Sequence, residues 1–156
     1  MNVYENLKAL NLALPSPPAK GGVYAPAKLT EDGMLYVSGC GPILDEPIAG
    51  KLGAEFTAED GVQFAQNCML NILAVVEAVV GDLNRVQDCV KILVLVAGTD
   101  TFYSQPQVAN GASGLLVSLF GAEAGTPSRS AIGAPALPGN IPVEVEAIFR
   151  VRGANT

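Results

Sequence analysis

Residues 128–150 read SRSAIGAPALPGNIPVEVEAIFR, and this stretch decides the fold. From 143 to 149 every second residue is apolar, the period of two expected of a strand with one buried face. The Pro, Gly and Asn residues before it indicate a turn, and a second strand precedes that turn. We therefore expect the two strands to pair, with Glu144 and Glu146 on one face and Arg129, near the start of the first strand, brought close to both glutamates.

Arg129 stands out because the chain has only 9 Lys and Arg residues. Most exposed charges are simply solvated, so a surface arginine with two solvated carboxylates is the alternative interpretation. The neighbouring residues favour a site. The sequence PSRSA at 127–131, Leu137-Pro138 after it and VEVEA at 143–147 resemble the signature of the RidA/YjgF family. These are the reactive-intermediate (enamine/imine) deaminases, also described as L-PSP endoribonucleases.

The resemblance implies a hydrolase that converts 2-imino and enamino acids to 2-keto acids and ammonia without a cofactor. Arg129 would anchor the substrate carboxylate, because the two parallel N–H donors of a guanidinium match two oxygens. Glu144 matches the residue that holds the attacking water, and a partly desolvated carboxylate can shuttle its proton. Alternation alone does not separate Glu144 from Glu146. The resemblance places further substrate contacts at Tyr24, Ser38, Gly39, Asn110 and Ala131.

The rest of the chain predicts an α+β fold. Apolar residues at helical spacing, with N-cap and glycine stop signals, predict helices over 3–12, 57–81 and 105–120. Strands are expected at 23–28, 34–39 and 86–97. The last of these is almost continuously apolar, as for a strand buried on both faces. Gly111 and Gly114 lower the propensity of the third helix and indicate that another element packs closely there.

The predicted order is thus (α)ββαβαββ, a mixed or antiparallel sheet with two long helices on one face. This order is similar to the chorismate-mutase-like (YjgF-like) fold of the family. The resemblance implies that three subunits form a barrel-like homotrimer with clefts between them.

A length of 156 residues favours a single domain over 1–156, and the resemblance marks 1–20 as an N-terminal extension. A hydrophobic fraction of 49% and a charged fraction of 15% indicate a packed globule with apolar surface to spare for other subunits. The net charge is −6 and no run of Lys or Arg is present. Nucleic-acid binding requires a basic footprint, so the endoribonuclease activity is disfavoured and no nucleic-acid partner is expected.

Histidine is absent, and the cysteines Cys40, Cys68 and Cys89 lack metal-ligand spacing, so no metal is expected. Without a histidine base, Cys40 is not expected to act as a nucleophile. Scattered thiols, an N-terminus without a signal-peptide pattern and apolar runs shorter than a membrane span favour a cytoplasmic protein with no membrane partner.

Three departures from the family pattern indicate a longer branch of the superfamily. Ala131 stands where many deaminases have a cysteine, the segment from Asn110 to Arg129 is expected to be a longer loop, and 1–20 is extra.

Three hypotheses stand beside the deaminase. They are a non-catalytic trimer that binds a small carboxylate such as a 2-keto acid in the same cleft, the endoribonuclease, and a purely structural or chaperone-like trimer.

Overall fold

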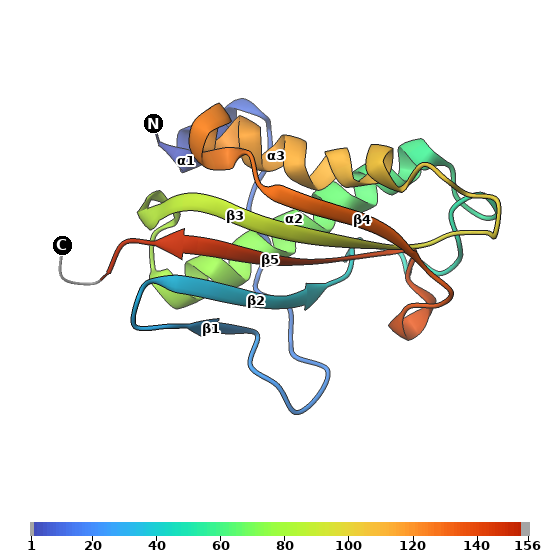
Figure 1. Ribbon diagram of the computed structural model, residues 1–156, viewed down its shortest axis with the longest axis horizontal. Helices are drawn as coiled ribbons and strands as arrows, with labels where there is room; N and C mark the ends of the chain where they lie inside the picture. Colours follow the sequence, from blue (N-terminus) through green and yellow to red (C-terminus); the bar gives the residue numbers. More distant parts are fainter. Residues whose placement is uncertain (1, 154–156) are drawn as a thin grey trace.

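The computed structural model describes residues 2–153, and its centre is a five-stranded sheet. The strands are β1 (Ala27–Leu29), β2 (Met34–Cys40), β3 (Val86–Ala97), β4 (Ser128–Ala134) and β5 (Val143–Val151). They lie in the order β1-β2-β5-β3-β4. Strand β4 runs parallel to β3 and the other pairs are antiparallel, so the sheet is mixed (Figure 1).

Two long helices, α2 (Ala58–Val80) and α3 (Gln105–Gly125), cover one face of this sheet. A short helix, α1 (Val3–Ala9), precedes the strands, and η1 (Leu83–Arg85) and η2 (Pro138–Asn140) are short 3-10 turns. Helix α2 passes behind the strands in Figure 1, and α3 runs along the β4 edge. Strand residues such as Ile92, Val94 and Val145 are buried beneath the helices. Burial of apolar area at about 25 cal/mol per Å² is the main favourable term for such a core. The predicted element order and α+β architecture are confirmed.

The ends of α2 follow directly from its sequence. The Thr57 hydroxyl accepts a hydrogen bond from the Asp60 backbone N–H at 3.1 Å, and the Asp60 carboxylate accepts one from the Thr57 N–H at 2.8 Å. This reciprocal capping box satisfies N–H groups that the first helical turn leaves free. Gly81 ends the helix in the left-handed conformation, with φ of 81°. By length and composition α2 could cross a membrane, but 61% of its most apolar window is buried inside the fold.

The predicted pairing of the two C-terminal strands is wrong. Strand β3 lies between β4 and β5 and pairs with both. The physical reason is the crossover through α3, which returns the chain beside β3 in the parallel direction, as in other strand–helix–strand units. The chain then crosses the end of β3, and β5 inserts between β3 and β2.

The second face of the sheet carries no helix in the described chain. On β3, Leu93 and Leu95 point to this open sheet face and are only half-buried, so the prediction of burial on both sides is wrong for a single chain. Neighbouring strands add Tyr36 and Ile132 to the same face, with exposed fractions of 48% and 49%. The open sheet face therefore presents apolar side chains that this chain does not cover.

Several boundaries also differ from the predictions. The first helix ends at Ala9, and the strand expected at 23–28 begins only at Ala27 and ends at Leu29. Helix α3 passes a non-helical Gly121 and continues to Gly125. Most of the segment expected to be a long loop between Asn110 and Arg129 is therefore helix.

Candidate active site

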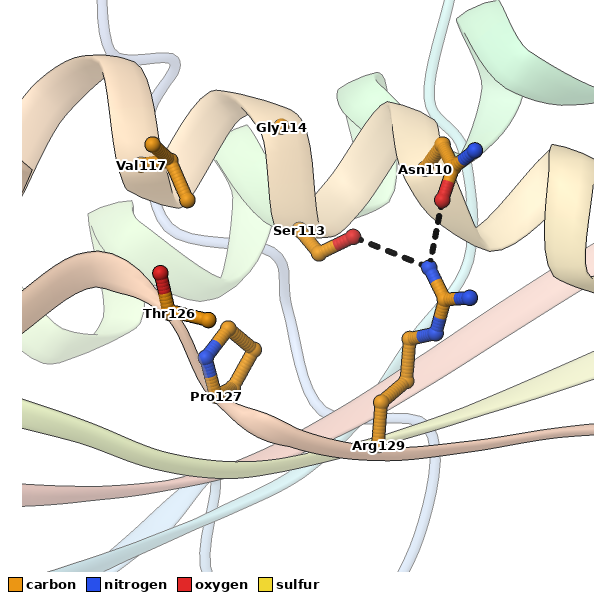
Figure 2. A pocket seen from close by; sticks show the side chains of 7 residues that line it. All are labelled: Asn110, Ser113, Gly114, Val117, Thr126, Pro127 and Arg129. Carbon is orange, nitrogen blue, oxygen red and sulfur yellow. Dashed lines mark hydrogen bonds between the residues drawn. The ribbon is translucent and has the colours of Figure 1, made fainter. Parts of the chain in front are cut away.

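Arg129 is the second residue of β4, and its side chain reaches helix α3 on the covered side of the sheet (Figure 2). Its Nη1 donates to Asn110 Oδ1 at 2.7 Å and to Ser113 Oγ at 3.1 Å. Both acceptors are neutral, so these contacts orient the guanidinium without compensating its charge. An anion could still bind there with a charge-assisted hydrogen bond.

A hollow of about 400 Å³ lies beside this arginine. It is lined by Asn110, Ser113, Gly114, Val117, Thr126, Pro127 and Arg129. Asn110 and Ser113 lie at the Arg129 end, whereas Val117, Thr126 and Pro127 lie at the other end (Figure 2). We call this the arginine hollow.

A second hollow, of about 490 Å³, lies at the end of β2 and the start of β5. It is lined by Gly21, Tyr24, Ser38, Gly39, Pro138, Glu144 and Glu146. We call it the glutamate hollow. It brings together the predicted site residues Tyr24, Ser38, Gly39 and Glu144 from three segments that are far apart in the sequence.

Glu144 packs directly against Gly39. A Cβ atom at position 39 would overlap the Glu144 carboxylate and would lie 3.2 Å from Glu144 Cγ, so a larger residue there would displace this carboxylate. The Ser38 hydroxyl donates to the Ala25 carbonyl at 2.7 Å, and the Tyr24 hydroxyl accepts from the Gly21 N–H at 3.1 Å. These bonds hold the loop before β1 against the strand end beside the carboxylate.

Burial raises the pKa of Glu144 above its usual value, and the negative charge of Glu146 raises it further. Glu144 is half-buried whereas Glu146 is exposed, although both point to the open sheet face. Burial also raises the pKa of Cys40 to about 11, so its thiol stays protonated at neutral pH. No group of three or more His, Cys, Asp or Glu side chains that could hold a metal ion occurs within residues 2–153.

The two hollows are separate within one chain. Arg129 pairs with Ile92 and hence aligns with Ala147 of β5, three residues from Glu144. Arg129 and Glu144 thus lie two strands apart across the sheet and three residues apart along it. At ordinary strand spacings their Cα atoms are about 14 Å apart. Their side chains also point to opposite faces of the sheet. The expectation that strand pairing brings Arg129 close to Glu144 and Glu146 is therefore wrong for a single chain.

The other predicted residues divide between the two sides. Asn110 lies on α3, and its side chain contacts Arg129. The contact with substrate that the resemblance implies for Asn110 stays a prediction. Ala131 is partly buried against the core and lines neither hollow. Ser113 was missed, because a serine within a helix carries no signal of its own. Its position one turn after Asn110, on the same helix face, was the available clue.

Two asparagines of α2 fix the loop that follows Gly39. The Asn71 side chain donates to the Gly41 carbonyl at 3.0 Å, and Asn67 Oδ1 accepts from the Ile43 N–H at 2.7 Å. From their one-turn spacing in the sequence, both asparagines are expected at the boundary of the apolar stripe of α2. This is correct for Asn67, which is half-buried, but wrong for Asn71, which is 1% exposed and belongs to the core. The strand end beside Glu144 is thus tied to the helix layer.

The N-terminal helix lies away from the glutamate hollow. In α1, the Tyr4 hydroxyl donates to Glu77 at 2.7 Å and accepts from the Leu83 N–H at 3.0 Å, and the Asn6 side chain donates to the Leu119 carbonyl. These contacts attach α1 to the C-terminal ends of α2 and α3. Only the segment after it, through Gly21, reaches the glutamate hollow.

Comparison with known proteins agrees with this architecture. The model of a family described as "YjgF/chorismate_mutase-like, putative endoribonuclease" matches residues 5–149. This chain therefore belongs to the YjgF/chorismate mutase-like family, which includes RidA proteins.

Three relatives illustrate the range of similarity. The protein TCP17 of Trypanosoma cruzi is 38% identical over 151 residues, which are 96% of this chain and 94% of TCP17. The crystal structure of Atu1372, a protein with unknown function from Agrobacterium tumefaciens, is 32% identical with a TM-score of 0.87 and covers 96% of this chain and 92% of its own. RidA from the Antarctic bacterium Psychrobacter sp. is 26% identical with a TM-score of 0.59 over 87% of this chain and 94% of its own.

Proposed function

We propose that this protein is a cofactor-independent hydrolytic deaminase that converts reactive 2-imino and enamino acids to 2-keto acids and ammonia. The observation that carries the proposal is Arg129, a guanidinium that lines a hollow and whose two hydrogen-bond partners, Asn110 and Ser113, are neutral. A planar carboxylate is the anion that best matches its parallel N–H donors. Every 2-imino acid carries such a carboxylate next to the reacting carbon.

Glu144 supplies the proton transfer that hydrolysis requires. With the imine nitrogen protonated, the carboxylate takes a proton from water as the oxygen bonds to the C=N carbon, and the nitrogen becomes a neutral amine. The carboxyl then gives this proton to the amine, and the C–N bond breaks. The hydroxyl proton passes to the carboxylate as the carbonyl forms, and the carboxyl returns it to the departing ammonia. A carboxyl whose pKa is raised by burial and by Glu146 can accept and return protons nearer to neutral pH.

We place the complete site between two copies of the chain. Arg129 and Glu144 point to opposite faces of one sheet, so one small substrate cannot contact both in a single chain. The apolar open sheet face, with Leu93 and Leu95 half-buried, supports association through that face. In the homotrimer that the family resemblance implies, the edge of Arg129 that points away from Val117 and Pro127 in one subunit (Figure 2) would face the glutamate hollow of the next. Self-association and a small carboxylate are the proposed partners, and we place this activity in the cytoplasm.

A non-catalytic carboxylate-binding protein is the second candidate. Ala131 favours it, because this position has no polar side-chain atom where many deaminases have a cysteine. Binding a 2-keto acid would need Arg129 but not Glu144. Neither candidate requires a nucleic acid, and the net charge of −6 argues against one.

The direct test is keto-acid release from imino acids that an amino-acid oxidase generates in the same vessel, with semicarbazide competing for free imine. A deaminase accelerates keto-acid and ammonia release and lowers semicarbazone formation. Arg152→Ala is the matched control, since it removes an exposed arginine outside both hollows. Saturable binding of 2-oxobutanoate without any acceleration on several imino acids would reject the deaminase and favour the binding protein.

The charge of Glu146 gives a prediction about pH. Because that charge raises the pKa of Glu144, Glu146→Gln should lower it, and the acid limb of the pH–rate profile should move to lower pH. The pH dependence of kcat/KM on one imino acid measures the shift. Glu31→Gln, in an exposed turn, should leave the profile unchanged. An acid limb that moves to higher pH in Glu146→Gln would contradict this prediction. An acid limb that is the same in Glu144→Gln as in the wild type would exclude Glu144 as the titrating group.

A further inference from the structure

We infer that Ser113 is a positioning residue that, together with Asn110, fixes the edge of Arg129 that meets the substrate carboxylate. The inference rests on the proposed function and adds to it a residue outside the family signature quoted above. The evidence is a chain of hydrogen bonds along one face of α3 that ends at the guanidinium (Figure 2).

The first step concerns the polarity of the serine hydroxyl. Ser113 Oγ donates its proton to the Ala109 carbonyl, one turn earlier in α3, at 3.2 Å. A hydroxyl has one proton and two lone pairs, so the oxygen can then only accept from other groups. This bond therefore turns the lone pairs of Ser113 toward Arg129 before any ligand binds.

The second step concerns which guanidinium hydrogens are used. Nη1 carries two hydrogens, and Asn110 Oδ1 and Ser113 Oγ accept one each, at 2.7 and 3.1 Å. The remaining donors are Nε–H and the two hydrogens of Nη2, which form the side edge of the guanidinium. In Figure 2 this edge points away from Ser113, Val117 and Pro127. Two parallel donors on one edge are the arrangement that binds a carboxylate bidentately.

The third step concerns Asn110. An arginine offers only donors, so the contact fixes the Asn110 oxygen toward Nη1 and turns the amide nitrogen outward. Figure 2 shows this nitrogen on the same side as Nη2 of Arg129. The donors of both residues thus face one region, which the neighbouring subunit would close. Ser113 lies on the opposite side and does not contact that region.

Preorganisation of this kind changes affinity because the free arginine side chain would otherwise lose rotamer freedom on binding. Ser113→Ala should weaken binding of 2-oxobutanoate by about tenfold or more, the loss expected when one hydrogen bond to a charged group is removed. Ser113→Thr retains the hydroxyl and its bond to the preceding turn, and should recover most of the affinity. For turnover, KM should rise more than kcat falls, since Ser113 does not touch the reacting atoms.

The matched control is Ser118→Ala. Ser118 lies on the same helix and makes the same type of bond, to the Gly114 carbonyl at 3.0 Å, but it is exposed and lines neither hollow. Both substitutions remove a serine from a helix interior, where alanine has the higher propensity. Thermal unfolding of the two variants should therefore be similar, and only Ser113→Ala should weaken 2-oxobutanoate binding.

A double-mutant cycle separates positioning from a merely structural effect. Calorimetric binding of 2-oxobutanoate is measured for the wild type, Ser113→Ala, Arg129→Lys and the double variant. Lysine has no side edge to orient, so Ser113→Ala should cost less than about twofold in that background. An equal loss in both backgrounds, or a loss matched by Ser118→Ala, would overturn the inference while the proposed function stands. A wild type that neither binds a 2-keto acid nor accelerates keto-acid release from imino acids would reject the proposed function itself.

Discussion

Arg129→Ala is expected to lower kcat/KM for 2-imino acids by about 100-fold or more. This corresponds to the loss of about 3 kcal/mol of binding energy from a bidentate, charge-assisted contact. Every oxygen of the substrate carboxylate would lose its charged donor, whereas the fold should be unaffected. Arg129 is exposed on an edge strand, and within residues 2–153 its side chain forms hydrogen bonds only with Asn110 and Ser113. Steady-state kinetics on one imino acid, with the unfolding temperature as a check, measure the effect.

Arg129→Lys distinguishes charge from geometry. Lysine keeps the positive charge as a single point but lacks the fork, so an intermediate loss of about tenfold is expected. Arg152→Ala should stay within about twofold of the wild type, because surface substitutions away from a site have small effects. Full activity in Arg129→Ala would contradict the role of this residue.

Gly111→Ala is expected to destabilise the protein by about 3 kcal/mol or more, because overpacking between two helices forces the backbone apart. A Cβ at position 111 would overlap the Val62 carbonyl oxygen of α2 and approach the Gln66 backbone nitrogen at 3.2 Å. Both contacts are with main-chain atoms of a buried helix, which cannot turn aside as a side chain can. Denaturant unfolding measures the loss, and reduced expression would be its first sign.

Gly114→Ala is the internal control for Gly111→Ala. A Cβ at Gly114 meets no atom within 4 Å, so the substitution should stabilise α3 by about 0.5–1 kcal/mol through helix propensity. Opposite signs for two glycine-to-alanine changes three residues apart would confirm that α2 and α3 pack closely at Gly111 alone. Equal effects of the two substitutions would contradict this packing.

The sequence predicted the elements well because their signals are local. The capping residues Thr57 and Gly81 mark both ends of α2, and the alternation over 143–149 identifies the buried face of β5. The two α3 glycines gave a partly correct prediction: close packing is confirmed at Gly111 and wrong at Gly114. The difference depends on which way each position faces, and α2 approaches only one of them.

Strand partners and the faces of the site could not be predicted in the same way. A period of two assigns side chains to two faces, but it does not say which strand lies beside which. Because β3 lies between β4 and β5, Arg129 and Glu144 lie on opposite faces of the sheet and not close together as expected. Burial distinguishes Glu144 from Glu146, because the side chain of Glu144 alone packs against Gly39. The assignment of Glu144 as the proton carrier stays a prediction.

The central claim is that Arg129 and Glu144 act together from different subunits, and subunit mixing tests it most directly. Arg129→Ala and Glu144→Gln proteins, each inactive alone, are unfolded together, refolded as a mixture and assayed for imine hydrolysis. In a cyclic trimer of random composition, about a quarter of the clefts would receive both native residues, and activity should recover toward that fraction of the wild type. A mixture that assembles but remains as inactive as either parent would contradict a site shared between subunits.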